Sequence, residues 1–296
     1  MTRLLTTTAL CTAAFLFAGS PRADAQTLLY GVGGTDTGAG PNAAAYTLFD
    51  FSSAAPSATT TVGTVTTSAG YALESIAFQP TTGSLYGFQY NGTTNQGQLV
   101  TINRSTGALA TVGTAFTIGS ISGSAGNSAT ISFNPTNGVV QLVTGTYGNY
   151  RINPATGGLL GQDASVAYAA GDTNANNTFQ ISSLAHNNAG TLYDIDYINN
   201  VLTTQDLSTG ALHTVGLLGF TATQGAPSEG FTIGAGNAAF LNSTASTQGG
   251  AVRDSLYSVN LATGAATSLG AIGGSATFNT VDLAAYVVPE PGTTGI

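Results

Sequence analysis

Two carboxylates, Asp194 and Asp196, are the residues of this sequence best placed to do chemistry. They occupy alternate positions of a strand-like run, so both side chains point to one face of the strand, about 7 Å apart. Carboxylates at that spacing can act as an acid–base pair or hold a metal ion. They can also be structural, because a buried carboxylate needs hydrogen-bond donors or a cation. The sequence leaves these three interpretations open.

A second group of oxygen-bearing side chains lies at Asp172, Asn174 and Asn176. Oxygen ligands at alternate positions open the calcium loop of an EF-hand. The sixth position is Asn177 instead of Gly and the twelfth is Ser183 instead of Glu, so half of the signature is missing. An Asn-rich turn is the simpler interpretation. The predicted ligands of a weakly bound Ca²⁺ are Asp172, Asn174, Asn176, Asp194 and Asp196, and no other cofactor is predicted.

The elements that must position these side chains come from one supersecondary unit that repeats five times. Its clearest copy spans residues 85–113 and consists of a Leu-Tyr strand, a second strand, a Ser-Thr-Gly turn and a final strand ending in Val-Gly. The same order recurs over residues 192–216, and its second half recurs over 256–270. A repeat of about 50 residues made of short strands is typical of a propeller or a solenoid.

Ring closure explains an imbalance between the two ends of the chain. The first strand of each unit is recognisable at residues 74–78, 130–133, 181–185, 230–233 and 281–286. The fifth copy has no strands after it, whereas the chain begins with three strand-like runs that have no first strand before them. Pairing of the two ends removes the open sheet edges. We predict an all-β, five-bladed β-propeller whose C-terminal strand pairs with the N-terminal strands; a β-sandwich or open solenoid is the alternative.

The histidines and serines do not form a recognisable catalytic group. His186 and His213 are the only histidines, and no Gly-x-Ser-x-Gly motif occurs. His213 falls in the last strand of its unit and is expected on a solvated outer strand, whereas His186 follows an innermost strand and could face the central channel. Zinc would require several convergent ligands, which the spacing does not supply. We therefore predict no catalytic residues.

Composition narrows the class of partner. The chain has 13 acidic residues, five arginines, no lysine and a formal net charge of −8. Nucleic-acid binding needs clustered Lys and Arg, and anionic membranes attract the same residues, so neither is a predicted partner. The single cysteine, Cys11, lies in the N-terminal segment, so disulfides do not stabilise the fold. An unknown extracellular glycan or protein, or a cation, is the expected partner.

The two termini carry targeting patterns. Residues 1–25 combine an early Arg, an apolar stretch and an Ala-Asp-Ala end, which predicts a cleaved signal peptide. We therefore expect no stable membrane insertion of the mature chain, which would hold a single propeller domain over residues 26–287. Residues 288–296 begin Val-Pro-Glu-Pro, which looks like the start of a Pro-Glu-Pro C-terminal sorting signal. Together these patterns predict a secreted or cell-surface protein of a Gram-negative bacterium.

The middle of the chain resembles an exported bacterial family, the domain-of-unknown-function 4394 family. The matching segments include residues 133–135, 150–157, 167–174 and 191–196, and the resemblance runs from about residue 28 to 285. The chain departs from the family at 138–141, where Gly-Val-Val-Gln replaces the usual alternating charges. The resemblance implies a propeller-like exported domain and no assigned activity.

These observations lead to one functional hypothesis and two alternatives. We expect a non-enzymatic exported β-propeller that acts as a binding or structural module at the cell surface or in the extracellular matrix. The loops at 117–127 and 169–178 are expected to lie near its binding face. The alternatives are a secreted polysaccharide hydrolase or lyase that uses Asp194 and Asp196, and a Ca²⁺-dependent adhesion module.

Overall fold

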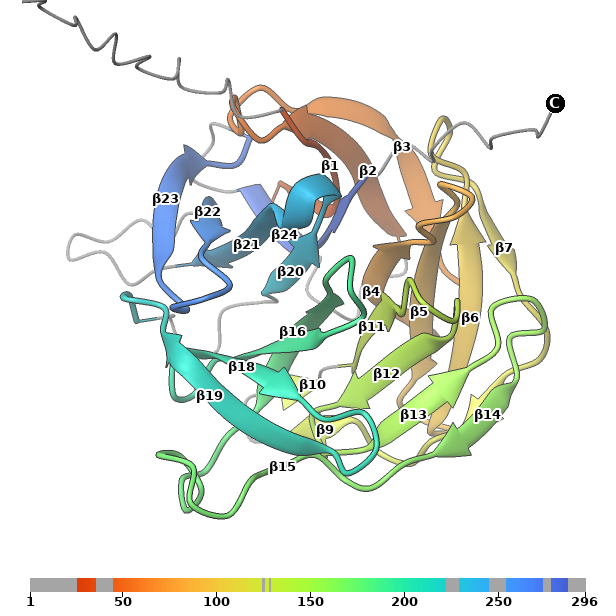
Figure 1. Ribbon diagram of the computed structural model, residues 1–296. Helices are drawn as coiled ribbons and strands as arrows, with labels where there is room; N and C mark the ends of the chain where they lie inside the picture. Colours follow the sequence, from red (N-terminus) through yellow and green to blue (C-terminus); the bar gives the residue numbers. More distant parts are fainter. Residues whose placement is uncertain are drawn as a thin grey trace, which may run out of the picture.

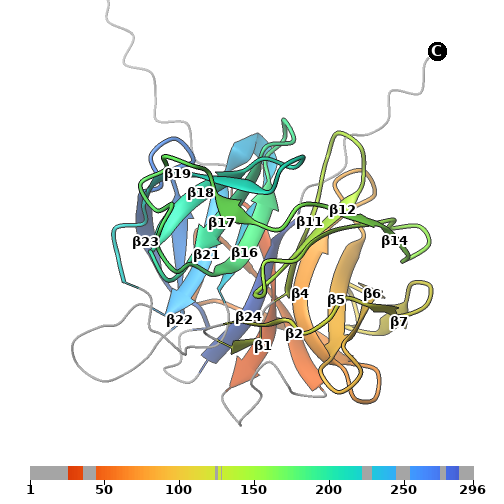
Figure 2. The ribbon, with the colours of Figure 1, turned by 90° about the horizontal axis from the view of Figure 1, so that it is seen from below.

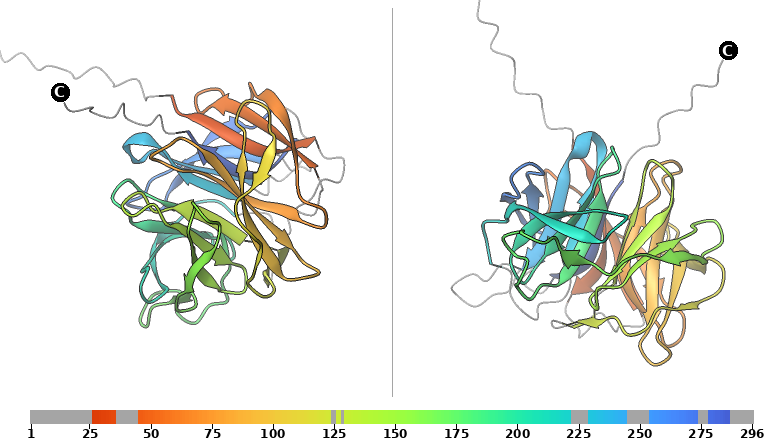
Figure 3. Two further views of the ribbon diagram at one scale, coloured as in Figure 1. Left: turned by 90° about the vertical axis from the view of Figure 1, so that its right-hand side faces the viewer. Right: turned by 60° about the horizontal axis from the view of Figure 1, so that its bottom comes forward.

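The protein is a five-bladed β-propeller, as the repeat predicted (Figure 1). The computed structural model describes residues 26–35, 45–123, 126–127, 129–221, 229–244, 254–273 and 278–286. The predicted leader and the predicted tail lie outside these residues. Within them, regular structure is almost entirely β-strand, in five sheets arranged around a central axis (Figures 1 and 3).

Each blade is an antiparallel sheet whose first strand lies innermost. From the axis outward, blade 1 contains β24 (Phe278–Ala285), β1 (Leu28–Thr35), β2 (Ala45–Ser52) and β3 (Thr60–Thr66). Blade 2 contains β4 (Ala72–Phe78), β5 (Leu85–Asn91), β6 (Gln96–Ile102) and β7 (Leu109–Thr111). Blade 3 contains β11 (Ala129–Phe133), β12 (Val140–Thr144), β13 (Asn149–Ile152) and β14 (Leu159–Gln162). Blade 4 contains β16 (Ile181–His186), β17 (Leu192–Asp196), β18 (Val201–Gln205) and β19 (Ala211–Leu217). Blade 5 contains β20 (Gly230–Ile233), β21 (Ala239–Thr244), β22 (Asp254–Val259) and β23 (Ala266–Ala271).

The two ends of the chain close the ring inside blade 1, which confirms the predicted closure. β24 pairs antiparallel with β1, and the register runs from Leu29 opposite Ala285 to Thr35 opposite Phe278. β1 in turn pairs with β2. The blade is therefore built from segments at opposite ends of the sequence.

The linkers between blades add short elements that the sequence pattern did not predict. β15 (Ala167–Tyr168) pairs in parallel with β19 and gives blade 4 a fifth strand. β8 (Phe116–Thr117) pairs with β6 beyond the end of the short β7. β9 (Ser122–Gly123) and β10 (Gly126–Asn127) form a separate two-stranded sheet, and η1 (Ala235–Asn237) is a single 3₁₀ turn. β15 and β8 cover strand edges that would otherwise be free to pair with another chain.

A ring of hydrogen bonds joins the inner strands across all five seams between blades. In each seam, a side-chain oxygen of one inner strand accepts a backbone N–H of the next. The pairs are Asp282 with Ile76 (2.7 Å), Ser75 with Ile131 (3.1 Å), Ser132 with His186 (2.9 Å), Ser183 with Phe231 (2.7 Å) and Thr232 with Ala285 (2.8 Å). Inner strands have a free edge, and a buried N–H without a partner is costly. The Ser, Thr and Asp side chains of the inner strands thus provide hydrogen-bond acceptors for backbone N–H groups of the neighbouring blade.

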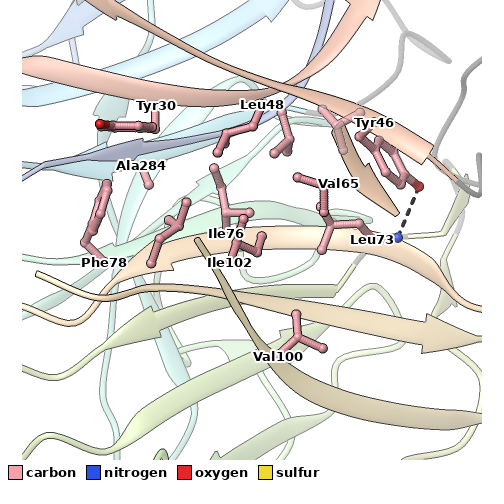
Figure 4. Packing of buried hydrophobic residues seen from close by; sticks show 13 residues of the cluster. Tyr30, Tyr46, Leu48, Val65, Leu73, Ile76, Phe78, Val100, Ile102 and Ala284 are labelled. Atoms are coloured by element: carbon pink, nitrogen blue, oxygen red, sulfur yellow. Dashed lines mark hydrogen bonds between the residues drawn. The ribbon is translucent and has the colours of Figure 1, made fainter. Parts of the chain in front are cut away.

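Apolar side chains fill the space between neighbouring blades. The cluster between blades 1 and 2 is the example drawn in Figure 4, where Leu48 and Val65 of blade 1 meet Leu73 and Ile76 of blade 2. In the same seam, the hydroxyl oxygen of Tyr46 from blade 1 accepts the backbone N–H of Leu73 from blade 2 at 3.1 Å. Burial on both faces of each blade explains why the inner strands read as nearly continuous apolar runs.

Candidate functional site

The two faces of the propeller are defined by the direction of the inner strands (Figure 2). The last residues of all five, Phe78, Phe133, His186, Ile233 and Ala285, line one cavity at the axis, so the inner strands end together. We call this side the end face and the opposite side, where the inner strands begin, the start face. The turns that follow the inner strands lie on the end face, and the linkers between blades lie on the start face.

Asp196 is buried and held by the protein's own donors. The hydroxyl of Tyr168 and the side-chain amide of Asn199 each donate to its Oδ2 at 2.6 Å. Its Oδ1 accepts the N–H groups of Gln180 (3.2 Å), Ile198 (3.1 Å) and Asn199 (3.3 Å). These contacts are those of a structural carboxylate at the end of β17, which fixes the turn after the strand and the linker before β16.

Asp194 lies on the same face of β17 but in a different environment. It is 0% exposed, and neither carboxyl oxygen has a hydrogen-bond partner. Burial raises the pKa of Asp194 well above its ordinary value, which favours the neutral acid. Gln205, opposite Leu192 on the neighbouring strand, shares this face and its side-chain amide also has no partner. The structure thus separates the predicted pair into a bonded and an unbonded carboxyl group.

The predicted calcium loop is closed by internal hydrogen bonds. Asp172 accepts the N–H of Asn174 (2.9 Å) and both the hydroxyl (2.6 Å) and the N–H (2.7 Å) of Thr214. Burial alone would raise the pKa of Asp172, but these hydrogen bonds outweigh it and lower the pKa. The loop meets Asp196 through Asn199, whose amide also donates to the carbonyl of Thr178 (3.0 Å). The structure therefore brings both halves of the predicted ligand set to one side of blade 4.

No metal-binding group is evident in the part of the chain that the structure describes, where no three His, Cys, Asp or Glu side chains gather suitably. Asp163, an acidic residue of blade 3, is paired with Arg151 at 2.9 Å. Arg104 lies 4.4 Å from the centre of the Tyr286 ring, a cation–π contact from blade 2 to blade 1. The cation site stays a prediction.

Four further carboxyl groups were not singled out from the sequence: Asp254 and Asp282 are buried, and Glu74 and Glu229 are partly buried. Burial raises the pKa of Glu74 to about 8, and that of Asp254 and Asp282 to about 7. Burial also raises the pKa of Glu229, although hydrogen bonds from Ser182 and Ser243 oppose it. Glu74 and Ser182 both sit at β-bulges, where an extra residue redirects a side chain. The sequence signal that could have identified these carboxyl groups is an acidic residue inside an apolar inner strand, as in residues 72–78.

His186 is the polar member of the ring of residues that ends the inner strands. It is 7% exposed, its Nδ1 lies 3.0 Å from the Ser132 hydroxyl, and its Nε2 has no partner. Burial lowers the pKa of His186 to about 4, so the ring is neutral at neutral pH. His213, on β19, is exposed as expected for an outer strand.

Three cavities of the described residues open on the end face. The axial cavity is small, about 50 Å³, which is room for water. A cavity of about 460 Å³ lies between blades 5 and 1, and a shallow depression of about 700 Å³ lies beside Arg104 on blade 2. No Asp or Glu lines any of these three, and the loops expected near the binding face contribute no lining residue. Part of the 117–127 loop lies outside the described residues.

Fold and cavities together define a closed β-propeller whose three described cavities lie on one face and contain no carboxylate, while Asp194, Asp196, Asp254 and Asp282 are buried. The chain belongs to the family described as domain of unknown function DUF4394, whose model matches residues 47–284. None of the curated proteins is significantly similar in sequence to this chain. Among the described residues, no helix is both long and apolar enough to cross a membrane.

Several solved structures are similar in fold. A candidate 6-phosphogluconolactonase from Bacteroides uniformis is 13% identical, with 83% of this chain and 82% of that one covered and a TM-score of 0.42. A protein of unknown function from Bacteroides caccae is 10% identical, with coverages of 88% and 99% and a TM-score of 0.42. A chain of the nidogen–laminin complex is 7% identical, with coverages of 90% and 99% and a TM-score of 0.47.

Proposed function

We propose that this protein is an exported, non-enzymatic binding module that acts at the cell surface or in the extracellular matrix. One observation carries the proposal: the buried carboxylates and the described cavities do not coincide. An acid or base must lie within hydrogen-bond reach of its substrate, directly or through one water. Asp194 and Asp196 are each 0% exposed, and neither lines a described cavity.

Two of the carboxyl groups with raised pKa values, Asp282 and Asp254, form hydrogen bonds across seams between blades. Asp282 accepts the N–H of Ile76 and the hydroxyl of Ser75, both at 2.7 Å, and so joins blade 1 to blade 2. Asp254 accepts the N–H of Thr280 and so joins blade 5 to blade 1. Perturbed pKa values often mark active sites, but ion and hydrogen-bond networks of the core produce them too. The position of Asp282 and Asp254 between blades supports a hydrogen-bond network of the core as the cause of their raised pKa values.

The charge of the molecule supports an uncharged ligand. Arg104 is the charged residue that lines one of the three described cavities, and the other two are lined by neutral side chains. A net charge of −8 opposes binding to nucleic acid and to anionic lipids. The export part of the proposal rests on the leader-like pattern of residues 1–25, and the glycan or protein partner on the extracellular location that it predicts.

Binding and turnover can be measured in one experiment. The purified protein is incubated with insoluble neutral and acidic polysaccharides, and the pellet is analysed for bound protein and the supernatant for new reducing ends or unsaturated products. We expect co-sedimentation with at least one polymer and no product. Product that disappears in the Asp194→Asn, Asp196→Asn double variant, at unchanged fold, would overturn the proposal in favour of a hydrolase or lyase.

A further inference from the structure

The seam between blades 5 and 1 is built differently from the other four. In those four, the turn before the last strand has the sequence Asn/Asp-x-x-Thr-Gly, and its Asn or Asp side chain accepts an N–H two residues later. The four turns begin at Asn103, Asn153, Asp206 and Asn260. Each ends in a Gly of positive φ, between 69° and 79°, which lets the turn lie flat against its neighbour.

These Thr-Gly turns pack closely against the backbone of the preceding blade, at its last strand or just beyond the end of that strand. A Cβ added at Gly107 would lie 2.8 Å from the carbonyl oxygen of Thr64, and one at Gly210 would lie 2.7 Å from that of Ser165. The same backbone approach occurs where Gly113 faces Thr156 and where Gly216 faces Thr263. Real Cβ atoms essentially never come closer than 3.0 Å, so glycine is required at these contacts. We call this contact between a Thr-Gly turn and the backbone of the preceding blade the interlock. It closes the outer part of four seams.

Blade 1 has no Thr-Gly turn to close the fifth seam. Its turn after β2 reads Ser-Ser-Ala-Ala-Pro over residues 52–56. A Cβ added at Gly270 of blade 5 would meet only the ring of Pro56, at 3.6 Å, which is an ordinary contact. The two blades are joined here by the N–H of Gly273, which donates to the carbonyl of Pro56 at 3.1 Å. At Gly270 the neighbouring blade therefore presents a side chain, whereas at the other four seams the glycine faces backbone.

The cavity of about 460 Å³ lies in this fifth seam. Ser53 and Ala54 of the replaced turn form one wall, and Leu269, next to Gly270, belongs to another. Its volume falls within the range of small-molecule sites, which is roughly 300–1,000 Å³. The cavity is thus a consequence of the missing interlock, at a position where each of the other seams is filled by backbone.

The chemistry of the lining selects the class of ligand. Phe240, Val259 and Leu269 supply apolar surface, and Gln26, Ser53, Asn237 and Ser258 supply neutral hydrogen-bonding groups. A charged ligand would lose its hydration here without gaining an opposite charge. Three of these polar groups each have a protein partner among the described residues: Ser53 Oγ accepts the N–H of Thr27, Asn237 Oδ1 accepts that of Asn188, and the Ser258 hydroxyl donates to the carbonyl of Thr267. Their remaining donors and acceptors would lose water to a purely apolar ligand and gain nothing in exchange. A sugar has apolar C–H faces, neutral hydroxyl groups and no charge, so it matches both parts of the lining.

We propose that this fifth-seam cavity binds the end of a neutral glycan. The inference rests on the proposed binding function and names its site and ligand class. Phe240 belongs to a buried apolar cluster, is 6% exposed and lines the cavity, so it is the aromatic side chain against which the C–H face of a sugar would pack. Because the volume of about 460 Å³ is that of a small-molecule site, the end of a glycan chain is the part proposed to enter it.

The test uses two tryptophan variants that differ in the seam. Ala54→Trp places a bulky side chain at the fifth-seam cavity. Ala262→Trp is the matched control, because Ala262 is exposed, lies in the Thr-Gly turn of blade 5 and lines no described cavity. The N–H of each alanine donates to the side-chain oxygen two residues earlier, at 3.2 Å for Ala54 and 2.9 Å for Ala262. Leu269→Asp, at a 38% exposed position, adds a charge to the lining.

Binding of labelled neutral oligosaccharides of glucose, N-acetylglucosamine, mannose, galactose and xylose is measured by fluorescence polarisation, with 1-octanol as an apolar competitor. We expect binding by the unmodified protein and Ala262→Trp, and at least about tenfold weaker binding by Ala54→Trp and Leu269→Asp at unchanged thermal unfolding. Equal binding by all four proteins overturns the site and leaves the binding function intact. If a polymer co-sediments with the protein but no labelled oligosaccharide binds, the proposed ligand class is wrong. The same holds if octanol displaces all of the bound oligosaccharide.

Discussion

Asp282 makes the stability of the ring depend on pH, and Asp282→Asn removes the contribution of this residue to that dependence. The carboxyl group is 4% exposed, and burial raises its pKa from 3.8 to about 7. Below about pH 4 the group is neutral in both the folded and the unfolded protein. Between pH 4 and 7 the unfolded chain loses the proton while the folded protein keeps it, so the stability falls as pH rises. Above about pH 7 both states are ionised and this contribution is flat.

The magnitude follows from the size of the shift. Each pKa unit is worth about 1.4 kcal/mol, so a shift of roughly three units changes the unfolding free energy by about 4 kcal/mol at most. Asn keeps a carbonyl oxygen that can accept the N–H of Ile76 but does not titrate in this range. The unfolding free energy of Asp282→Asn, measured relative to that of the unmodified protein, should therefore rise by about 4 kcal/mol as the pH goes from 4 to 8.

Urea unfolding at each pH from 4 to 8 measures the effect, with the urea m-value checked for constancy. Asp206→Asn is the control. Asp206 is exposed in a turn, and hydrogen bonds from Ser208 and Thr209 lower its pKa to about 2, so its titration lies below this pH range. The stability curves of Asp206→Asn and the unmodified protein should be parallel. Parallel curves for Asp282→Asn as well would show that Asp282 is not held neutral by burial, and the reasoning would fail.

Three further predictions concern the seams and the cation. Gly113→Ala should cost at least about 2 kcal/mol more than Gly138→Ala in urea unfolding, because both have positive φ but only Gly113 faces backbone of the next blade; equal costs would refute the interlock. Tyr168→Phe should lower the unfolding free energy by about 1–3 kcal/mol by removing the hydrogen bond to Asp196, and an unchanged value would contradict a structural role. Because Asp172 and Asp196 are satisfied internally, 1 mM Ca²⁺ after chelator treatment should leave the melting temperature unchanged; a site at 100 times its dissociation constant would add about 2.7 kcal/mol and raise it by several degrees.

The blades could be predicted from the sequence because each is specified locally. Strands of alternating Leu, Tyr, Val and Thr, and turns ending in Thr-Gly, recur at regular spacing, and the missing first strand pointed to closure by β24. The added strand β15 was not predictable, since Ala167 and Tyr168 become a strand only where β19 offers an open edge.

The candidate site was less accessible to sequence reasoning. Asp194 and Asp196 look equivalent in the sequence, but only the three-dimensional structure shows that Tyr168 and Asn199 reach one of them and no donor reaches the other. The fifth-seam cavity lies where residues 52–56 lack a Thr-Gly turn. The sequence alone does not show that blade 5 packs against this turn, so the effect of the missing glycine on the seam could not be predicted. The contacts between blades depend on how distant segments pack together, and a repeat pattern carries no information about that packing.

The pairing of β24 with β1 also determines the order in which the propeller can fold. Leu29 and Ala285 are partners at opposite ends of the described chain, so blade 1 lacks its inner strand until the last strand has emerged from the ribosome. Until then the edge of β1 is unpaired and can bind other chains. Contacts this distant in sequence slow folding, because the loop entropy is lost before the pairing is gained. Blades 2 to 5 can assemble earlier, and joining of the ring is expected as the late, slow step.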